Sequence, residues 1–197
     1  MMAKLDMWKQ RAQEVLRGDP NADQILRAFF GVLQFIHGRE WQGACHAASS
    51  VLYVLLREQA VPAHAVIGEV RGDIAVFSHS WSEIDGAVYD AAISKTLVKN
   101  DAFAPVMKGI DLESGNSTQV QYGIGTELRP DPDAARIRSM PFVEYMDGFP
   151  GHKRGLWGLA GEIGSRSGIY VNAGRARQRY SDTRWIIRQA GGDRPRE

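Results

Sequence analysis

A change in the spacing of apolar residues near residue 60 is the feature that most constrains the fold. Before it, apolar residues recur at helical spacing over residues 5–16, 25–36 and 45–58. After it, residues 63–70, 74–84 and 87–93 have the composition of strands, and the turn signals at 71–73 and 85–86 join them as hairpins. Helices followed by hairpin-linked strands predict an α+β fold, with N-terminal helices packed on a small antiparallel sheet.

The pattern is weaker beyond residue 95. We expect a strand at 120–124, a short helix ending at Met140, and irregular backbone or close packing over 148–168, where glycine recurs. A last amphipathic helix is predicted from Ser181 to the glycines at 191–192. These features predict a core over residues 1–95 and a glycine-rich, basic C-terminal extension over residues 96–197, packed on that core as part of a single domain.

Net charge excludes a chain dedicated to binding nucleic acid or a membrane surface. The 197 residues include 24 Lys and Arg and 23 Asp and Glu, which gives a formal net charge of +1. The distribution is uneven, with a net −5 over residues 1–150 and +6 over residues 151–197. We expect the arginines of the tail to form a solvated face or to pair with the acidic residues of the first 150, and we do not expect nucleic-acid binding. These arginines are Arg175, Arg177, Arg179, Arg184 and Arg188.

The longest apolar stretches are far shorter than the roughly 20 residues of a membrane span. The first 13 residues carry Lys4, Asp6, Lys9 and Arg11 and contain no apolar core of a secretory signal. We therefore expect a cytoplasmic protein with no membrane segment. Its one cysteine, Cys45, excludes an intramolecular disulfide and any CxxC metal or redox site.

Cys45 lies in the first turn of the third predicted helix, where the helix dipole lowers the pKa of a thiol. A cysteine nucleophile also needs a histidine that is held by a carboxylate or an amide. If Ile84 and Ala87 close the hairpin, His79 lies within diagonal reach of Asp90 on the next strand. The alternative for each residue alone is structural: a buried cysteine, a satisfied strand histidine and an aspartate that ends a strand.

Three motifs in order resemble the transglutaminase-like, papain-related cysteine enzyme superfamily. The first is Gly43-Ala44-Cys45-His46-Ala47-Ala48, and the second is Leu55-Leu56-Arg57 followed by Val61-Pro62-Ala63-His64-Ala65-Val66-Ile67-Gly68. The third is His79-Ser80-Trp81-Ser82-Glu83-Ile84, followed by a strand that ends at Asp90. The 34 residues from Cys45 to His79 and the 11 from His79 to Asp90 are similar to the spacing of small bacterial members, including leader-peptide peptidases.

The resemblance implies Cys45 as nucleophile, His79 as general base and then acid, and Asp90 as its orienting partner. It implies cleavage of an amide bond in a peptide or protein, without metal or cofactor. The alternatives are acyl transfer to an amine, as in crosslinking or deamidation, and a binding module without catalysis that uses the same fold.

Further residues complete the predicted site. We expect the backbone N–H of Cys45 and a group of Gln42 or Trp41 to bind the oxyanion, and Trp81 to pack under the site. The other histidines are expected to be structural, and His46 should point about 100° away from the thiol on the helix. These are His37, His46, His64 and His152.

Overall fold

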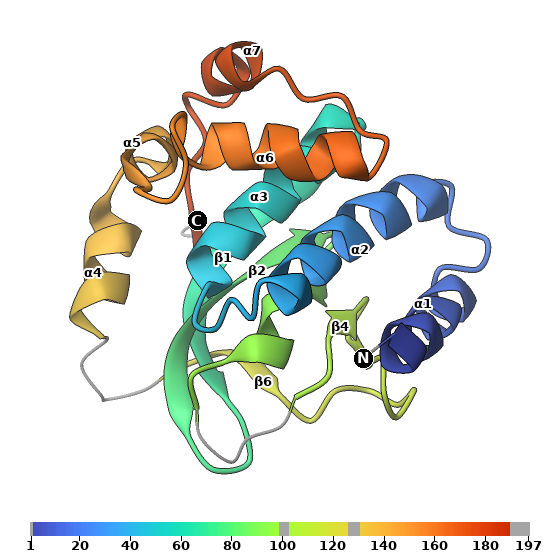
Figure 1. Ribbon diagram of the computed structural model, residues 1–197. Helices are drawn as coiled ribbons and strands as arrows, with labels where there is room; N and C mark the ends of the chain where they lie inside the picture. Colours follow the sequence, from blue (N-terminus) through green and yellow to red (C-terminus); the bar gives the residue numbers. More distant parts are fainter. Residues whose placement is uncertain (1, 99–102, 126–130, 190–197) are drawn as a thin grey trace, which may run out of the picture.

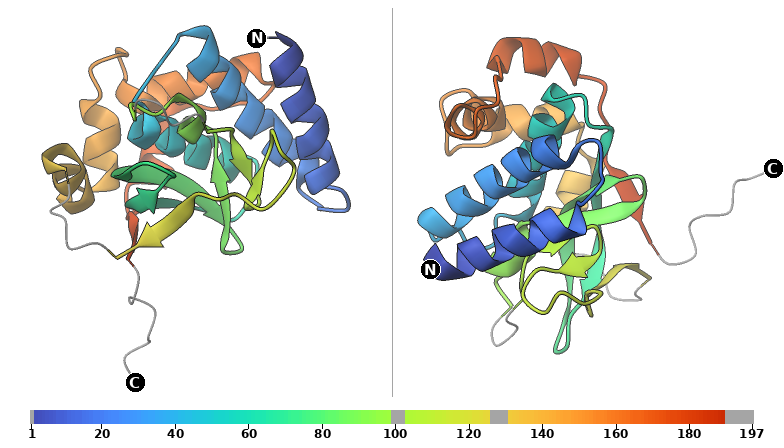
Figure 2. Two further views of the ribbon diagram at one scale, coloured as in Figure 1. Left: turned by 90° about the horizontal axis from the view of Figure 1, so that it is seen from below. Right: turned by 90° about the vertical axis from the view of Figure 1, so that its right-hand side faces the viewer.

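The computed structural model describes residues 2–98, 103–125 and 131–189, in which helices pack against one side of a curled, mainly antiparallel sheet (Figure 1). The α+β class with helices at the N-terminus is therefore confirmed. The first helices are α1 (Met2–Val15), α2 (Ala22–Gly38) and α3 (Cys45–Glu58). Figure 2 shows in its left view that these helices and α6 (Gly155–Arg166) lie on the same side of the strands.

Helix α3 is the centre of the core. All of its residues from Ala47 to Leu56 are buried, because α2 and α6 cover it on one side and the sheet on the other. A helix that is buried on nearly every side needs apolar and small residues all round, which the sequence AASSVLYVLL supplies. Its two serines satisfy their hydroxyls on the helix itself, since Ser50 Oγ donates to the His46 carbonyl oxygen at 2.7 Å.

The three predicted strands are β1 (Ala63–Arg71), β2 (Val76–Ile84) and β3 (Ala87–Asp90). The β2–β3 register pairs Ile84 with Ala87 and Ser82 with Tyr89, as the two-residue turn predicted. Strand β3 ends three residues earlier than expected. The Asp90 carboxylate accepts hydrogen bonds from the backbone N–H groups of Ala92 and Ile93, both at 3.0 Å, which turns the chain into the short 3₁₀-helix η1 (Ala92–Lys95).

Four further strands extend the sheet. They are β4 (Val106–Met107), β5 (Ile110–Asp111), β6 (Gln121–Ile124) and β7 (Ile186–Arg188). The strand order is β5-β4-β3-β2-β1-β6, and β7 pairs in parallel with the same edge of β1 that β6 uses further along. Strand β6 and helix α4 (Pro132–Ser139) agree with the predicted strand at 120–124 and the predicted helix before Met140.

For the C-terminal half, one prediction holds in part and another is wrong. Irregular backbone was one alternative for the glycine-rich stretch, but residues 155–166 of this stretch form helix α6. Close packing was the other alternative, and it holds at Gly164, where a Cβ would lie 2.7 Å from the Ile169 carbonyl oxygen. Where a helix was expected after Ser181, residues 186–188 form strand β7, because the edge of β1 offers backbone partners to its β-branched residues; the predicted helix end at 191–192 lies outside the described residues. Helices α5 (Phe142–Gly148) and α7 (Ala173–Arg179) were not predicted.

The C-terminal half shares its core with the first 95 residues. One cluster of buried side chains runs from Trp8 in α1 to Trp185 just before β7. Three arginines of the basic tail form ion pairs with acidic residues, namely Arg177 with Asp147, Arg179 with Glu58, and Arg188 with Glu83. Among the described residues, no helix has both the length and the apolar character needed to span a membrane.

Candidate active site

Cys45 is the first residue of α3, and its side chain is half-buried. The loop before it is tied down by a hydrogen bond from the Gly43 N–H to the Lys95 carbonyl oxygen at 3.0 Å. Gly43 has a φ of +66°, a left-handed backbone conformation that favours glycine at this position. The N-cap residue, Ala44, has no side-chain acceptor for the N–H groups of the first turn.

His79 and Asp90 form a buried pair on adjacent strands. His79 Nε2 lies 2.7 Å from Asp90 Oδ2, and both side chains are at most 2% exposed. The hairpin register brings the two side chains together, as the sequence predicted. Since Nε2 is used by the carboxylate, Nδ1 is the ring nitrogen left for the thiol.

Asp90 is held by more donors than the sequence indicated. Its Oδ1 accepts the two backbone N–H groups at the start of η1, and its Oδ2 accepts the Tyr122 hydroxyl at 2.9 Å in addition to His79. Tyr122 comes from β6, which approaches the site only because it pairs with β1. Nothing in the local sequence around Tyr122 links it to Asp90, so this contact was missed.

The electrostatics of the site favour a thiolate–imidazolium pair. Burial raises the pKa of the Cys45 thiol, but the charges of His46 and His79 and hydrogen bonds with both rings outweigh it and lower the pKa from 9.0 to about 5. Burial lowers the pKa of His79, whereas charge and hydrogen-bond interactions with Asp90 and Cys45 raise it from 6.5 to about 10. At pH values between about 5 and about 10, Cys45 is therefore negative and His79 is positive.

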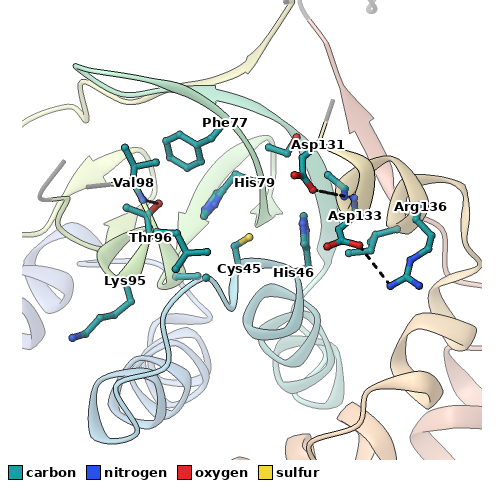
Figure 3. Close-up of a pocket in the computed structure, with 16 residues that line it drawn as sticks. Cys45, His46, Phe77, His79, Lys95, Thr96, Val98, Asp131, Asp133 and Arg136 are labelled. Carbon is teal, nitrogen blue, oxygen red and sulfur yellow. Dashed lines mark hydrogen bonds and ion pairs between the residues drawn. The ribbon is translucent and has the colours of Figure 1, made fainter. Parts of the chain in front are cut away.

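His46 lies beside the thiol, and the prediction that its side chain points away is wrong. Figure 3 shows the Cys45 sulfur between the rings of His79 and His46. The ring of His46 is turned toward the sheet, where its Nδ1 lies 2.6 Å from the Ser80 hydroxyl. Helical geometry separates the Cα–Cβ directions of neighbouring residues, but a long side chain in a first turn can still swing back over the helix end.

Above Cys45 lies a pocket of about 580 Å³, a size common for small-molecule and peptide side-chain sites. Figure 3 shows Phe77, Thr96 and Val98 on one side of it. On the other side it shows Asp131, the N-cap residue of α4, with Asp133 and Arg136 of that helix. The described lining residues are Gly43, Cys45, His46, Phe77, Ser78, His79, Ala92, Lys95, Thr96, Leu97, Val98, Asp131, Asp133, Ala134, Arg136 and Ile137.

The structure brings Cys45, His79 and Asp90 together, but neither of the two predicted oxyanion residues, Gln42 and Trp41, is among the described residues that line the pocket. Gln42 is exposed, and Trp41 packs between the rings of Phe35 and Phe149. Trp81 is buried with its ring edge against Tyr122, with 5.1 Å between the centroids. None of these three is among the described residues that line the pocket.

A family model of the transglutaminase-like superfamily matches residues 3–108. The chain therefore belongs to the transglutaminase-like superfamily, whose members are generally cysteine enzymes. The match covers α1 to β4 and includes Cys45, His79 and Asp90. No curated protein and no solved structure matches the chain.

Proposed function

We propose that this protein is a cysteine hydrolase that cleaves an amide bond in a peptide or protein. The observation that carries the proposal is the position of the Cys45 thiol: it lies at a helix start, on the floor of an open pocket, beside a histidine held by a buried aspartate. Superfamily membership supports a cysteine hydrolase or acyltransferase, and the triad roles are our assignment.

The first half-reaction would use the charges already present at the site. The Cys45 thiolate attacks the acyl carbon, a C–S bond forms, and the carbonyl electron pair moves to oxygen. When the carbonyl re-forms, the C–N bond breaks and the leaving nitrogen takes the proton from His79. Asp90 fixes the ring and stabilises its positive charge throughout.

Hydrolysis of the thioester would return the site to its starting state. Once the thiolate charge is consumed, the interactions with Cys45 that raise the pKa of His79 are lost, so its pKa falls and the ring stays neutral and free to accept a proton. It takes a proton from water as the water oxygen attacks the thioester. Collapse breaks the C–S bond and releases a carboxylic acid, with Cys45 again a thiolate and His79 again an imidazolium.

The α3 N-terminus supports the same chemistry. The N–H of Cys45 precedes the first intrahelical hydrogen bond, and Ala44 has no side chain that could accept hydrogen bonds from this turn. Free N–H groups at a helix start are suited to an oxyanion that forms on the carbonyl of a substrate.

The first experiment is the rate of Cys45 alkylation by iodoacetamide as a function of pH, in the wild type and in His79→Ala. With a single thiol per chain, one mass shift reports the reaction. We expect a reactive plateau that extends well below pH 7 in the wild type and is lost in His79→Ala. A wild-type thiol that reacts only above about pH 8.5 would contradict the proposal and favour the binding module without catalysis.

A second experiment identifies what resolves the thioester. A peptide library is incubated with the protein in H₂¹⁸O together with a fluorescent primary amine, and the products are read by mass spectrometry. Hydrolysis places one ¹⁸O in each new C-terminal carboxylate, whereas acyl transfer attaches the amine. We expect ¹⁸O to be incorporated by the wild type and not by Cys45→Ser. Attachment of the amine without ¹⁸O incorporation would show acyl transfer instead of hydrolysis.

A further inference from the structure

We propose that His46 is a second catalytic histidine, which donates a hydrogen bond from Nε2 to the oxyanion, and that Ser80 is its positioning residue. The inference rests on the proposed function, because an oxyanion forms only if Cys45 attacks an acyl group. It starts from the arrangement in Figure 3, where the two histidines flank the thiol from opposite sides of the pocket floor.

The two rings have different partners and therefore different chemistry. His79 Nε2 faces a carboxylate, which stabilises a positive ring that can give up or take a proton. His46 Nδ1 faces a hydroxyl, 2.6 Å away. Nε2 carries a proton in either state of the ring: in the neutral ring when the Ser80 hydroxyl donates to Nδ1, and in the positive ring, whose Nδ1 donates to the Ser80 oxygen. In both states Nε2 is a hydrogen-bond donor toward the pocket.

Ser80 is suited to hold the ring still. It is fully buried on β2, directly after His79, so one strand positions both histidines. His46 itself is half-buried and lines the pocket, which lets one edge of the ring reach a substrate while the other is fixed to the sheet. A donor fixed before the reaction loses little free energy to reorganisation when the oxyanion forms.

The structure places neither of the predicted second oxyanion donors among the described residues of the pocket. Gln42 and Trp41 were predicted to assist the Cys45 N–H, but neither is among the described lining residues of the pocket. His46 lies where such a donor is needed, next to the sulfur to which the acyl carbon would bind. It also lowers the pKa of the Cys45 thiol, so it would act on both the resting thiolate and the oxyanion.

The test compares two reactions of the same thiolate. Alkylation by iodoacetamide forms no oxyanion, whereas acetylation by 4-nitrophenyl acetate passes through one. Both rates scale with the fraction of thiolate, so their ratio at pH 9.5 is insensitive to a change in the pKa of Cys45. The variants are His46→Ala, His46→Gln, Ser80→Ala and, as a matched control, His64→Ala on the exposed side of β1.

We expect the acetylation-to-alkylation ratio to fall about 10- to 100-fold in His46→Ala. It should recover to within a few-fold of the wild type in His46→Gln, whose amide can donate, fall less in Ser80→Ala, and stay unchanged in His64→Ala. An unchanged ratio in His46→Ala overturns the inference.

The remaining outcomes are also decisive. If His46→Ala does not fold, as judged by circular dichroism, Ser80→Ala carries the test, since it keeps the ring and removes only its anchor; an unchanged ratio there overturns the inference. The proposed function is judged separately by the low-pH plateau of wild-type alkylation. Without that plateau, the proposed function fails and the role of His46 fails with it.

Discussion

Asp90 connects three separate parts of the chain through one carboxylate. It accepts hydrogen bonds from His79 on β2, from Tyr122 on β6 and from the two backbone N–H groups that begin η1. Because all four partners donate, the position requires a group that only accepts. An asparagine has the right shape, but its amide group would face donors on one side.

Asp90→Asn should therefore reduce the reactivity of Cys45 at low pH. Loss of the carboxylate charge lowers the pKa of His79, and a ring that is less often positive stabilises the thiolate less, so the pKa of Cys45 rises. We expect alkylation by iodoacetamide at pH 6 to slow at least about 10-fold and to approach the wild-type rate near pH 9.5, where the thiol ionises without help.

The matched control for this substitution is Asp85→Asn. Asp85 lies in the exposed β2–β3 turn with a φ of +51°, a conformation that asparagine tolerates. The substitution Asp85→Asn makes the same change of charge as Asp90→Asn, on the same hairpin. If Asp85→Asn slowed the reaction at pH 6 as much as Asp90→Asn does, a general change in net charge would explain the effect, and the specific pairing with His79 would not.

At the scale of single residues, the sequence predicted those positions that depend only on the geometry of neighbouring residues in the chain. The two-residue turn fixed the register that brings His79 to Asp90, and the start of the helical pattern placed Cys45 at a helix end. Tyr122 and His46 were missed or misassigned because their contacts depend on how β6 joins β1 and how α3 packs on β2. No spacing within the sequence encodes those contacts.

Among the elements, α6 shows why the C-terminal half was harder to predict. The glycines of α6 reduce its helix propensity, yet they let α6 lie close against α3 and against the segment that follows α6. A Cβ at Gly164 would meet the Ile169 carbonyl oxygen at 2.7 Å and Leu55 Cδ2 at 3.2 Å. Tertiary packing thus overrides the local preference for irregular backbone, as it does for β7 at the edge of β1.

Gly164→Ala should destabilise the fold, and Gly161→Ala should not. The two glycines are on the same helix, but a Cβ at Gly161 would have its nearest neighbour at 3.5 Å, which is an ordinary contact. We expect Gly164→Ala to lower the free energy of unfolding by about 1–3 kcal/mol, because the backbone carbonyl of Ile169 must move. Gly161→Ala should be neutral or stabilising by up to about 1 kcal/mol through helix propensity.

Urea unfolding followed by circular dichroism measures both values. Equal effects of the two substitutions would contradict close packing of α6, since the helix propensity change is the same at both sites. Although α6 packs against the helix that carries Cys45, Gly164 is not among the described residues that line the pocket, so Gly164→Ala should not change the pH profile of alkylation in the fraction that remains folded.

For the whole molecule, the proposed ion pair makes stability depend on pH in a way that tests the site without a substrate. The pKa of Cys45 is lowered on folding, so the contribution of this group to the free energy of unfolding is present above pH 9.0 and is lost as the pH falls through about 5. The pKa of His79 is raised on folding, so the contribution of this group to the free energy of unfolding is present below pH 6.5 and is lost as the pH rises through about 10.

Counting protons gives the combined curve. Between about 5 and 10 the folded pair holds one proton, whereas the unfolded pair holds two below 6.5, one between 6.5 and 9.0, and none above 9.0. Stability from the pair therefore rises with pH from about 5 to 6.5, is level to 9.0, and falls from there toward 10.

The difference in unfolding free energy between the wild type and Cys45→Ser/His79→Gln isolates this curve, because neither replacement titrates in that range. We expect the difference to be level from about pH 6.5 to 9 and to decrease on both sides, while His64→Gln follows the wild type. A difference that decreases steadily from pH 7 to 9 would mean that the folded pair holds two protons in that range, so that the thiol keeps its ordinary pKa beside a positive His79. Cys45 would then be a neutral thiol over this pH range, which would contradict the thiolate–imidazolium pair on which the proposed function rests.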